Sequence, residues 1–318
     1  MRTLYLFGNG FDIAHGINTP YSSFRAFLSK RHEDFLRQFE ELYHIQPLDD
    51  TEPWYTESAQ KRWEQRVLKD LWRCFEEEIG NPDVFGMHDL AESLAYEMPT
   101  ENVKDTLDVH WREQYSFSKR FQKYVLEWLE TIDTSKAVCK KRELLNNGFD
   151  SFMNFNYTDT LERVYGIKNV LHIHGGVPTC STTPPIMGHG NKQLIDSYRK
   201  KAQAAQDEFI EWEESVCNAI ADYCETLYKD TNRIILRHEA FFSSLHDIEQ
   251  VICLGLSWGK VDTPYLVRIQ EAIMPTAKWV VYYYDSATHD RLKEIFGELG
   301  ISNKHEVHFL QSDSFWDK

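Results

Sequence analysis

The sequence has few cysteines, and no two of them form a Cys-x-x-Cys pair. Its six cysteines lie at irregular intervals along 318 residues, unlike the frameworks that cross-link small secreted domains. The sequence also lacks a basic leader followed by a long apolar stretch, and it has no apolar run of about 18 residues. We therefore expect neither a signal peptide nor a membrane span, and we predict a cytoplasmic protein in a reducing compartment.

Basic residues are outnumbered as well. The chain has 35 lysines and arginines against 50 aspartates and glutamates, and its formal net charge is −15. A chain of this charge repels nucleic acid phosphates, and no dense basic block appears beyond short pairs such as Lys140 and Lys141. We therefore expect no nucleic acid partner.

Short apolar runs rich in β-forming residues recur along the chain, as buried parallel strands do. They are Thr3–Phe7, Phe152–Phe155, Val170–Ile173, Val251–Leu254, Trp279–Tyr284 and His305–Leu310. Helical patterns follow the second and the fourth run, which is the order that builds parallel βαβ units. The sequence predicts an α/β fold, with a Rossmann-like parallel sheet of about six strands covered by helices and large helical insertions.

Two long helical stretches interrupt the predicted sheet. The first contains Glu57–Ile79, in which apolar residues recur along one helical face. We predict an α/β nucleotide-binding-type core over residues 1–29, 148–190 and 246–318. Residues 30–147 form one helical insertion, and residues 191–245 form a second insertion or a lid. Alternatively, both stretches only cover the sheet, because parallel sheets need helices on their faces.

A glycine turn follows the first predicted strand. Gly8 and Gly10 flank Asn9, where glycines let the backbone approach a phosphate and N–H groups bind its charge. The dinucleotide fingerprint Gly-x-Gly-x-x-Gly fails at Ile13, which argues against a hydride-transferring Rossmann enzyme. Asp12 is expected at the same sheet edge. The alternatives are a turn that serves chain geometry only, and a cap or surface role for Asp12.

Polar residues also follow the second predicted strand. Asn156 offers both a donor and an acceptor at the carboxyl edge, and Thr158 lies beside it. Alternatively, Thr158 caps the next helix and Asn156 bonds a loop.

Two histidines close the third predicted strand. His172 and His174 are two residues apart, so we expect both on one side of the pleat. A neutral His174 beside a glycine turn is a candidate general base. The alternative is a metal site completed by His189 or Asp12.

The fourth predicted strand ends at a second glycine, Gly255. Ser257 lies just beyond it, and Asp262 opens the next helix, so this edge faces the same ligand zone. The irregular segment Gly175–Gly190 is rich in proline, threonine, serine and glycine, and such long segments are more often functional than not.

Taken in order, five blocks of the chain resemble those of the bacteriophage abortive infection AbiH family. They are LYLFGNGFDIAHGINTPYSSF, FMNFNYTDTLERVY, NVLHIHGG, PIMGHGN and VICLGLSWGKVDTPYL. The resemblance spans nearly the whole chain and is weakest in the helical insertions. It implies a role in phage defence, with a phage-derived trigger as a partner.

The same order also resembles a distant version of the sirtuin-like NAD-binding fold. On that resemblance, Gly8 and Gly10 contact the phosphates, Asn156 orients the ribose, His174 is the base, and Ser257 and Asp262 hold the adenosine side. Neighbouring residues complete the expected nucleotide site: Asn9, Phe11, Asp12, Tyr157, Thr158, Gly175 and Gly255. The zinc-binding cysteine module of sirtuin deacetylases is absent, which argues against deacetylation.

Three functional hypotheses follow. The preferred one is a defence effector that binds NAD or a related nucleotide and cleaves its nicotinamide glycosidic bond, with no metal cofactor expected. The alternatives are a metal-dependent nuclease or phosphoesterase using His172, His174 and Asp12, and a non-catalytic nucleotide-sensing module. An unrestrained NAD-destroying enzyme would kill its host, so we expect restraint through a homo-oligomer or occlusion by the helical insertions.

Overall fold

The computed structural model describes residues 1–43, 45, 48, 51, 55–97, 103–146 and 149–317. The chain divides into two compact units. The first comprises Met1–Ser23, Val125–Ile186 and Asp230–Lys318, and the second comprises Phe24–Tyr124 and Met187–Lys229. Both predicted insertions contribute to the second unit, but the part of the first insertion from Val125 onward and the part of the second insertion after Lys229 belong to the first unit. The predicted boundary at residues 147 and 148 lies outside the described residues.

The first unit is built on one sheet. In the described part of the chain it has six strands, all parallel, in the order β3-β2-β1-β4-β5-β6. The strands are β1 (Thr3–Phe7), β2 (Ser151–Asn154), β3 (Val170–His172), β4 (Gln250–Leu254), β5 (Lys278–Tyr283) and β6 (Val307–Gln311). The predicted Rossmann-like parallel sheet is confirmed, and its strand order is that of the doubly wound nucleotide-binding fold.

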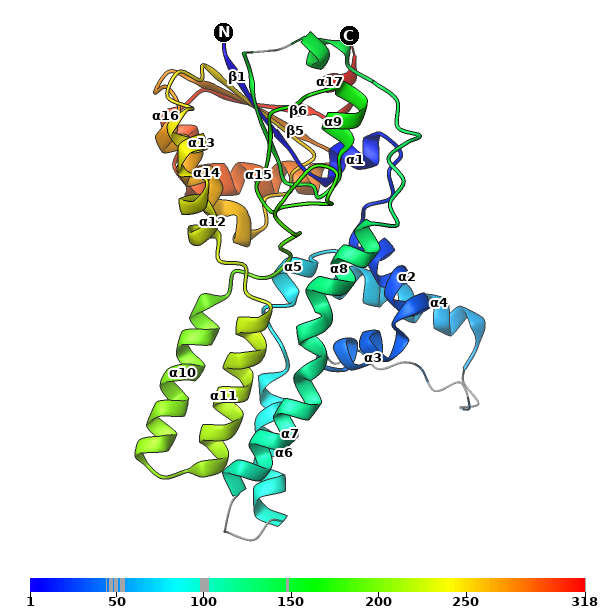
Figure 1. Cartoon of the computed structure of the whole chain (residues 1–318), viewed down its shortest axis with the longest axis vertical. Helices are drawn as coiled ribbons and strands as arrows, with labels where there is room; N and C mark the ends of the chain where they lie inside the picture. Colours follow the sequence, from blue (N-terminus) through cyan, green and yellow to red (C-terminus); the bar gives the residue numbers. More distant parts are fainter. Residues whose placement is uncertain are drawn as a thin grey trace. The chain divides into compact units, whose positions relative to one another are not determined.

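Helices cover both faces of this sheet. Figure 1 shows α12, α13, α14 and α16 gathered on one side of the strands, and α1, α9 and α17 on the other. Buried residues of α15 join the first group, which is then α12 (Thr231–Arg237), α13 (Glu239–Ser243), α14 (Thr263–Ala272), α15 (Ser286–Glu298) and α16 (Ile301–Lys304). A buried residue of η3 joins the second group, which is then α1 (Asn9–Ala14), η3 (Arg142–Asn146), α9 (Thr160–Tyr165) and α17 (Asp313–Trp316). Each group of helices packs on its face of the sheet through a separate cluster of buried hydrophobic residues.

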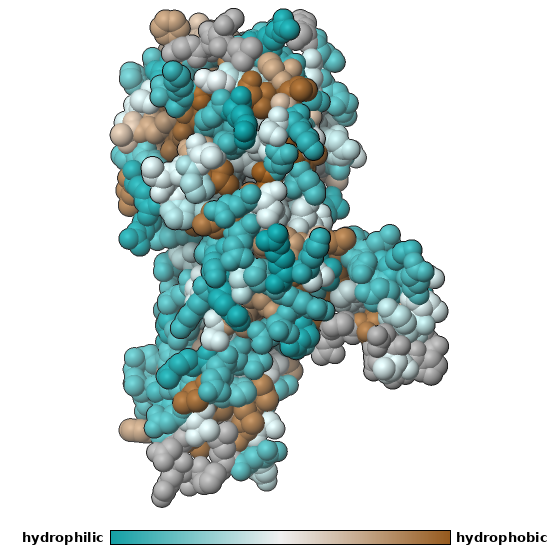
Figure 2. Space-filling view, turned by 45° about the vertical axis from the view of Figure 1, so that its right-hand side comes forward, coloured by the Kyte–Doolittle hydropathy of each residue, from teal (hydrophilic) through white to brown (hydrophobic). Residues whose placement is uncertain are grey.

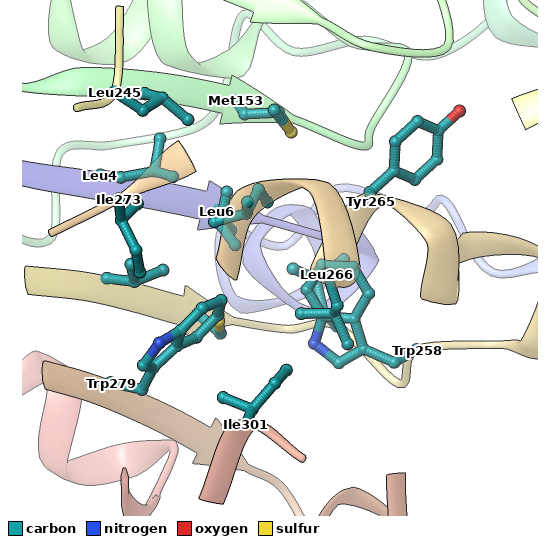
Figure 3. Close-up of a cluster of buried hydrophobic side chains, with 14 of the residues drawn as sticks. Leu4, Leu6, Met153, Leu245, Trp258, Tyr265, Leu266, Ile273, Trp279 and Ile301 are labelled. Atoms are coloured by element: carbon teal, nitrogen blue, oxygen red, sulfur yellow. The ribbon is translucent and has the colours of Figure 1, made fainter. Parts of the chain in front are cut away.

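Strand alternation explains the two clusters. In β1, Leu4 and Leu6 face the larger cluster while Phe7 faces the smaller one, because successive side chains point to opposite faces. Figure 3 shows the larger cluster, with Trp258 and Tyr265 toward the arrowheads of the strands. The strand ends that carry the candidate residues are therefore anchored in a closely packed core.

The second unit is helical. It contains most of α2 (Tyr21–Arg31) and the beginning of α8 (Phe121–Leu129). Its other helices are α3 (Glu33–Glu41), α4 (Glu57–Val67), η1 (Leu68–Trp72), α5 (Phe75–Glu78), α6 (Val84–Glu97), α7 (Val103–Tyr115), η2 (Ser116–Arg120), α10 (Lys192–Asp207) and α11 (Glu211–Thr226). The helical stretch predicted over Glu57–Ile79 is thus divided into α4, η1 and α5, with Cys74 as the residue before α5.

A buried ion pair lies within the aromatic core of the second unit. Glu40 accepts hydrogen bonds from Nε of Arg25 at 2.7 Å and from Nη2 of Arg25 at 3.0 Å. Its Oε1 also accepts from Nε1 of Trp72 at 2.7 Å. Because every partner is a donor, this carboxylate is compensated although it is buried.

Hydrophilic residues cover most of the surface seen in Figure 2. Among the residues that the structure describes, no helix has both the length and the apolar character needed to cross a membrane.

Candidate functional site

The carboxyl ends of β1 and β4 mark the point where the strand order reverses direction. From β1 the sheet continues through β2 and β3 on one side, and through β4, β5 and β6 on the other. In open parallel sheets, ligands bind in the crevice at this switch point. The glycine turn after β1 and Gly255 after β4 meet there.

The two glycine turns touch through their backbones. The N–H of Gly8 donates to the carbonyl of Leu254 at 2.9 Å, and that of Gly10 donates to the carbonyl of Gly255 at 3.0 Å. A Cβ on Gly8 would lie 2.5 Å from the carbonyl oxygen of Gly255. The glycines are therefore required for close approach, and the N–H groups of Gly8 and Gly10 are already used within the protein. The predicted phosphate contacts would have to come from other groups.

Two neighbours of this turn are also engaged within the first unit. Nδ2 of Asn9 donates to the carbonyl of Thr19 at 3.2 Å, and the Thr19 hydroxyl donates to Oδ1 of Asn9. The Phe11 ring is fully buried, with its centroid 4.4 Å from those of Phe7 and His15. Asn9 and Phe11 therefore stabilise the turn in this structure.

Asn156 connects the β2 edge to the glycine turn. Its Nδ2 donates to the carbonyl of Gly8 at 3.0 Å, and its backbone N–H donates to Oδ1 of Asn154 at 3.0 Å. The alternative prediction, that the Asn156 side chain bonds a loop, is therefore confirmed for Nδ2, which bonds the residue that follows β1. Oδ1 of Asn156 makes no hydrogen bond with the described residues, so the side chain keeps an acceptor at the sheet edge.

Asp12 is fully buried and holds the β2–α9 turn. Its carboxylate accepts hydrogen bonds from the hydroxyls of Thr158 at 2.6 Å and Thr160 at 2.7 Å. The N-cap residue of α9 is Asp159, so Thr158 does not cap this helix. Burial raises the pKa of Asp12 to about 6, against the lowering effect of the two hydroxyls. Asp12 therefore fastens the Asn156 turn at the cost of a buried charge.

This burial predicts an unusual pH dependence. Asp12 binds its proton more tightly in the folded chain, with a pKa of about 6, than in the unfolded chain, where the value is 3.8. Its contribution to stability is thus present below pH 3.8 and is lost as the pH rises through about 6. Relative to Asp12→Asn, the wild type should gain about 1 to 2 kcal/mol between pH 7.5 and pH 5. Urea unfolding of both proteins at the two pH values measures this difference, and a constant difference would contradict it.

His172 has both ring nitrogens engaged. Nε2 lies 2.7 Å from Oε1 of Glu162, and Nδ1 lies 3.2 Å from the carbonyl oxygen of Asn156. Nδ1 also lies 3.8 Å from Sγ of Cys180. Burial and then the charge of Glu162 raise the pKa of the Cys180 thiol to about 12, so this cysteine is a neutral thiol near pH 7 and a poor nucleophile. His172 is therefore a structural residue that joins β3 to α9.

His174 lies in different surroundings. The expectation that both rings share one side of the strand required β3 to reach His174, but β3 ends at His172 and a turn follows. The His174 ring centroid lies 5.4 Å from those of Phe155 and Tyr265 and 6.4 Å from that of Tyr157. Its Nε2 lies 3.4 Å from Oδ1 of Asp262. The turn thus places this ring among aromatic side chains beside a carboxylate.

The loop after β4 has an unusual backbone. Gly255 adopts φ of +72°, and Trp258, which is 1% exposed, adopts φ of +49°. Left-handed backbone at a buried tryptophan is uncommon and costs free energy, and such strain gathers at functional sites. Ser257, between them, is exposed to solvent. This loop leads directly to Asp262.

The part of the irregular segment that belongs to the first unit, residues 175–186, is hydrogen-bonded to the residues around His174. Gly175 adopts φ of +70°, and the N–H of Ile186 donates to the carbonyl of His174 at 2.8 Å. The Tyr157 hydroxyl donates to the carbonyl of Ile186 at 3.1 Å. These bonds hold the segment against the residues beside His174.

The metal alternative finds no ligand set in the described ranges. No three His, Cys, Asp or Glu side chains gather there in an arrangement that could hold a metal ion. His189 belongs to the second unit, where Nε2 lies 2.9 Å from the carbonyl oxygen of Cys224 and Nδ1 accepts from the N–H of Asn191 at 3.1 Å. Burial lowers the pKa of His189 to about 4, so its ring is neutral.

Several residues of the site were not predicted. Glu162, Phe155, Trp258 and Tyr265 contact the two histidines or lie next to their partners. Phe155 and Tyr265 read as ordinary core residues in the sequence, and no local pattern marks a backbone with positive φ at Trp258. The signal that could have identified these residues is their place in two of the blocks that resemble the AbiH family, FMNFNYTDTLERVY and VICLGLSWGKVDTPYL.

Comparison with known proteins identifies one family. A family model described as bacteriophage abortive infection AbiH matches residues 4–283. No curated protein and no solved structure matches the chain significantly. The sirtuin-like resemblance therefore stays a prediction.

Proposed function

Because the chain belongs to the bacteriophage abortive infection AbiH family, we propose that it is a phage-defence effector that hydrolyses NAD or a closely related nucleotide. The bond cleaved is the one between nicotinamide and its ribose. Loss of NAD would stop metabolism in an infected cell before phage could multiply.

One observation carries this proposal. At the carboxyl edge of the sheet, the His174 ring lies among aromatic side chains with Nε2 3.4 Å from the Asp262 carboxylate. A histidine oriented by a carboxylate is the arrangement of a general base. The strand order supports a nucleotide ligand, since this edge includes the switch point where doubly wound sheets bind nucleotides.

The reaction can be written with these residues. Water attacks C1′ of the ribose while the bond from C1′ to the pyridinium nitrogen breaks. The nitrogen keeps the bonding electron pair, so nicotinamide leaves as a neutral molecule. His174 takes the proton of the water and later returns it to solvent. Oδ1 of Asn156 accepts a hydrogen bond from a ribose hydroxyl and so orients the sugar. Nδ2 of the same side chain is already bonded to the carbonyl of Gly8, which fixes the direction of Oδ1.

The test is incubation of the purified chain with NAD, followed by chromatography of nicotinamide and ADP-ribose. A parallel incubation includes an extract of phage-infected cells, to supply a trigger. We expect equal amounts of the two products in at least one condition. If NAD stays intact in both conditions, the proposal is wrong, and the hypothesis of a non-catalytic nucleotide-sensing module is favoured.

A further inference from the structure

Asp262 occupies a capping position without capping a helix. It is the N-cap residue of α14, a helix of 10 residues, and its side chain makes no capping hydrogen bond. Aspartates at this position ordinarily accept a hydrogen bond from a backbone N–H of the first turn. Oδ1 of Asp262 lies instead 3.4 Å from Nε2 of His174, an atom from another strand end.

Asp262 can carry a negative charge, and the buried Nε2 of His174 needs a hydrogen-bond acceptor. The amino end of α14 stabilises a negative charge on Asp262, and the side chain remains 18% exposed. Nε2 of His174 is buried and forms no hydrogen bond of ordinary geometry, although a carboxylate oxygen lies within reach. Catalytic hydrogen bonds are often long before a ligand binds and shorten in the complex. A slight shift of the ring toward Asp262 would satisfy Nε2.

The aromatic neighbours limit the other orientations of the ring. Phe155 meets the His174 ring edge to face at an interplanar angle of 83°, and Tyr265 lies across it at 54°. Tyr265 is three residues after Asp262, so one turn of α14 supplies both the carboxylate and an aromatic wall. Nδ1 makes no hydrogen bond with the described residues.

We propose that Asp262 is the positioning residue of His174. Its carboxylate accepts the Nε2–H, which fixes the tautomer in which Nδ1 carries the lone pair. Nδ1 then takes the proton from the attacking water, and the resulting imidazolium, protonated on both nitrogens, is stabilised by the negative charge of Asp262. The kinetic consequence rests on the proposed function. The assigned role differs from the adenosine contact that the sirtuin-like resemblance implies.

The chain offers a matched control in Asp285. This residue is the N-cap of α15, and its side chain accepts from the N–H of Thr288 at 2.7 Å. Asp285→Ala should lower the melting temperature through the lost cap and leave His174 unchanged. Asp262→Ala should change His174 without loss of a cap. Asp262→Asn, of nearly the same size, is the second variant if Asp262→Ala does not fold.

The first readout is the tautomer of His174, which does not depend on activity. Protein labelled with ¹⁵N-histidine is examined by long-range ¹H–¹⁵N correlation near pH 8, and His174 is assigned from the signals missing in His174→Gln. We expect a protonated Nε2 and an unprotonated Nδ1 in the wild type and in Asp285→Ala. In Asp262→Ala the two nitrogens should move toward averaged values. An unchanged tautomer in Asp262→Ala overturns the inference, whatever the activity.

The second readout separates positioning from ligand binding. If Asp262 acts through His174, Asp262→Ala lowers kcat at least about tenfold with KM nearly unchanged, and Asp262→Glu restores part of the loss. A rise in KM with unchanged kcat would assign Asp262 to the ligand and overturn the inference. If the wild type releases no nicotinamide but the tautomer responds to Asp262→Ala, the proposed reaction fails while the positioning role stands.

Discussion

His174→Ala should slow nicotinamide release by about 10²- to 10⁴-fold, the range over which a general base contributes to a rate. The variant removes a ring that lies beside Asp262 and among the aromatic side chains of Phe155, Tyr157 and Tyr265. Product chromatography over long incubations measures the residual rate. A thermal melt checks that the variant is still folded. His174→Gln removes less side-chain volume and serves as a second variant if His174→Ala is unstable.

The control for this prediction is His308→Ala. His308 lies on β6, where its side chain is 52% exposed and pairs with Glu306 at 2.8 Å. Removal of this surface pair should change neither the rate nor the melting temperature appreciably. Full activity in His174→Ala would exclude His174 as the base, and ligand binding that also survives would favour the sensor hypothesis.

Gly255→Ala should destabilise the chain by about 2 to 5 kcal/mol, through a left-handed backbone and a steric conflict. Gly255 adopts φ of +72°, and its Cβ would lie 2.5 Å from the backbone nitrogen of Phe11 and 2.7 Å from Cα of Gly10. These are backbone atoms of α1, so neither can move aside as a flexible side chain would. Denaturant unfolding followed by circular dichroism measures the loss.

Gly300→Ala isolates the conformational part of this cost. Gly300 adopts φ of +69°, close to that of Gly255, but a Cβ there would meet nothing within 4 Å. We expect a loss of only about 1 to 2 kcal/mol. The difference between the two losses in unfolding free energy measures the steric cost at Gly255, where the backbone lies close to Gly10 and Phe11. Equal losses would show that the turns do not touch as described.

The histidine pair shows how far the sequence could be used. Alternation along a strand predicted both rings on one side, and it would have been right had the strand continued through His174. The strand ends at His172, so His172 pairs with Glu162 while His174 lies beside Asp262. The predicted strand ended at Ile173 and the observed strand ends one residue earlier, which is a small error in the fold but changes which side chains surround each histidine.

The glycine turn shows a similar division. Glycine after a short apolar run is a local signal, and Gly8 does follow β1, but Asn9 and Gly10 form the first residues of α1 and not a separate turn. The reason for the glycines was not local. Gly8 and Gly10 lie against Leu254 and Gly255, more than 240 residues later in the chain, and their N–H groups donate to the carbonyls of these two residues and not to a phosphate.

The sequence by itself determined the parallel sheet, the family, and the strand ends at which polar residues gather, because hydrophobic periodicity and glycine punctuation are written in neighbouring residues. Only the tertiary structure decided which of those residues pair. Asp12 meets Thr158 across 146 residues, and Asp262 lies beside His174 from another strand end. Burial, hydrogen bonding and the pKa of Asp12 depend on such distant contacts, so no local pattern could have shown them.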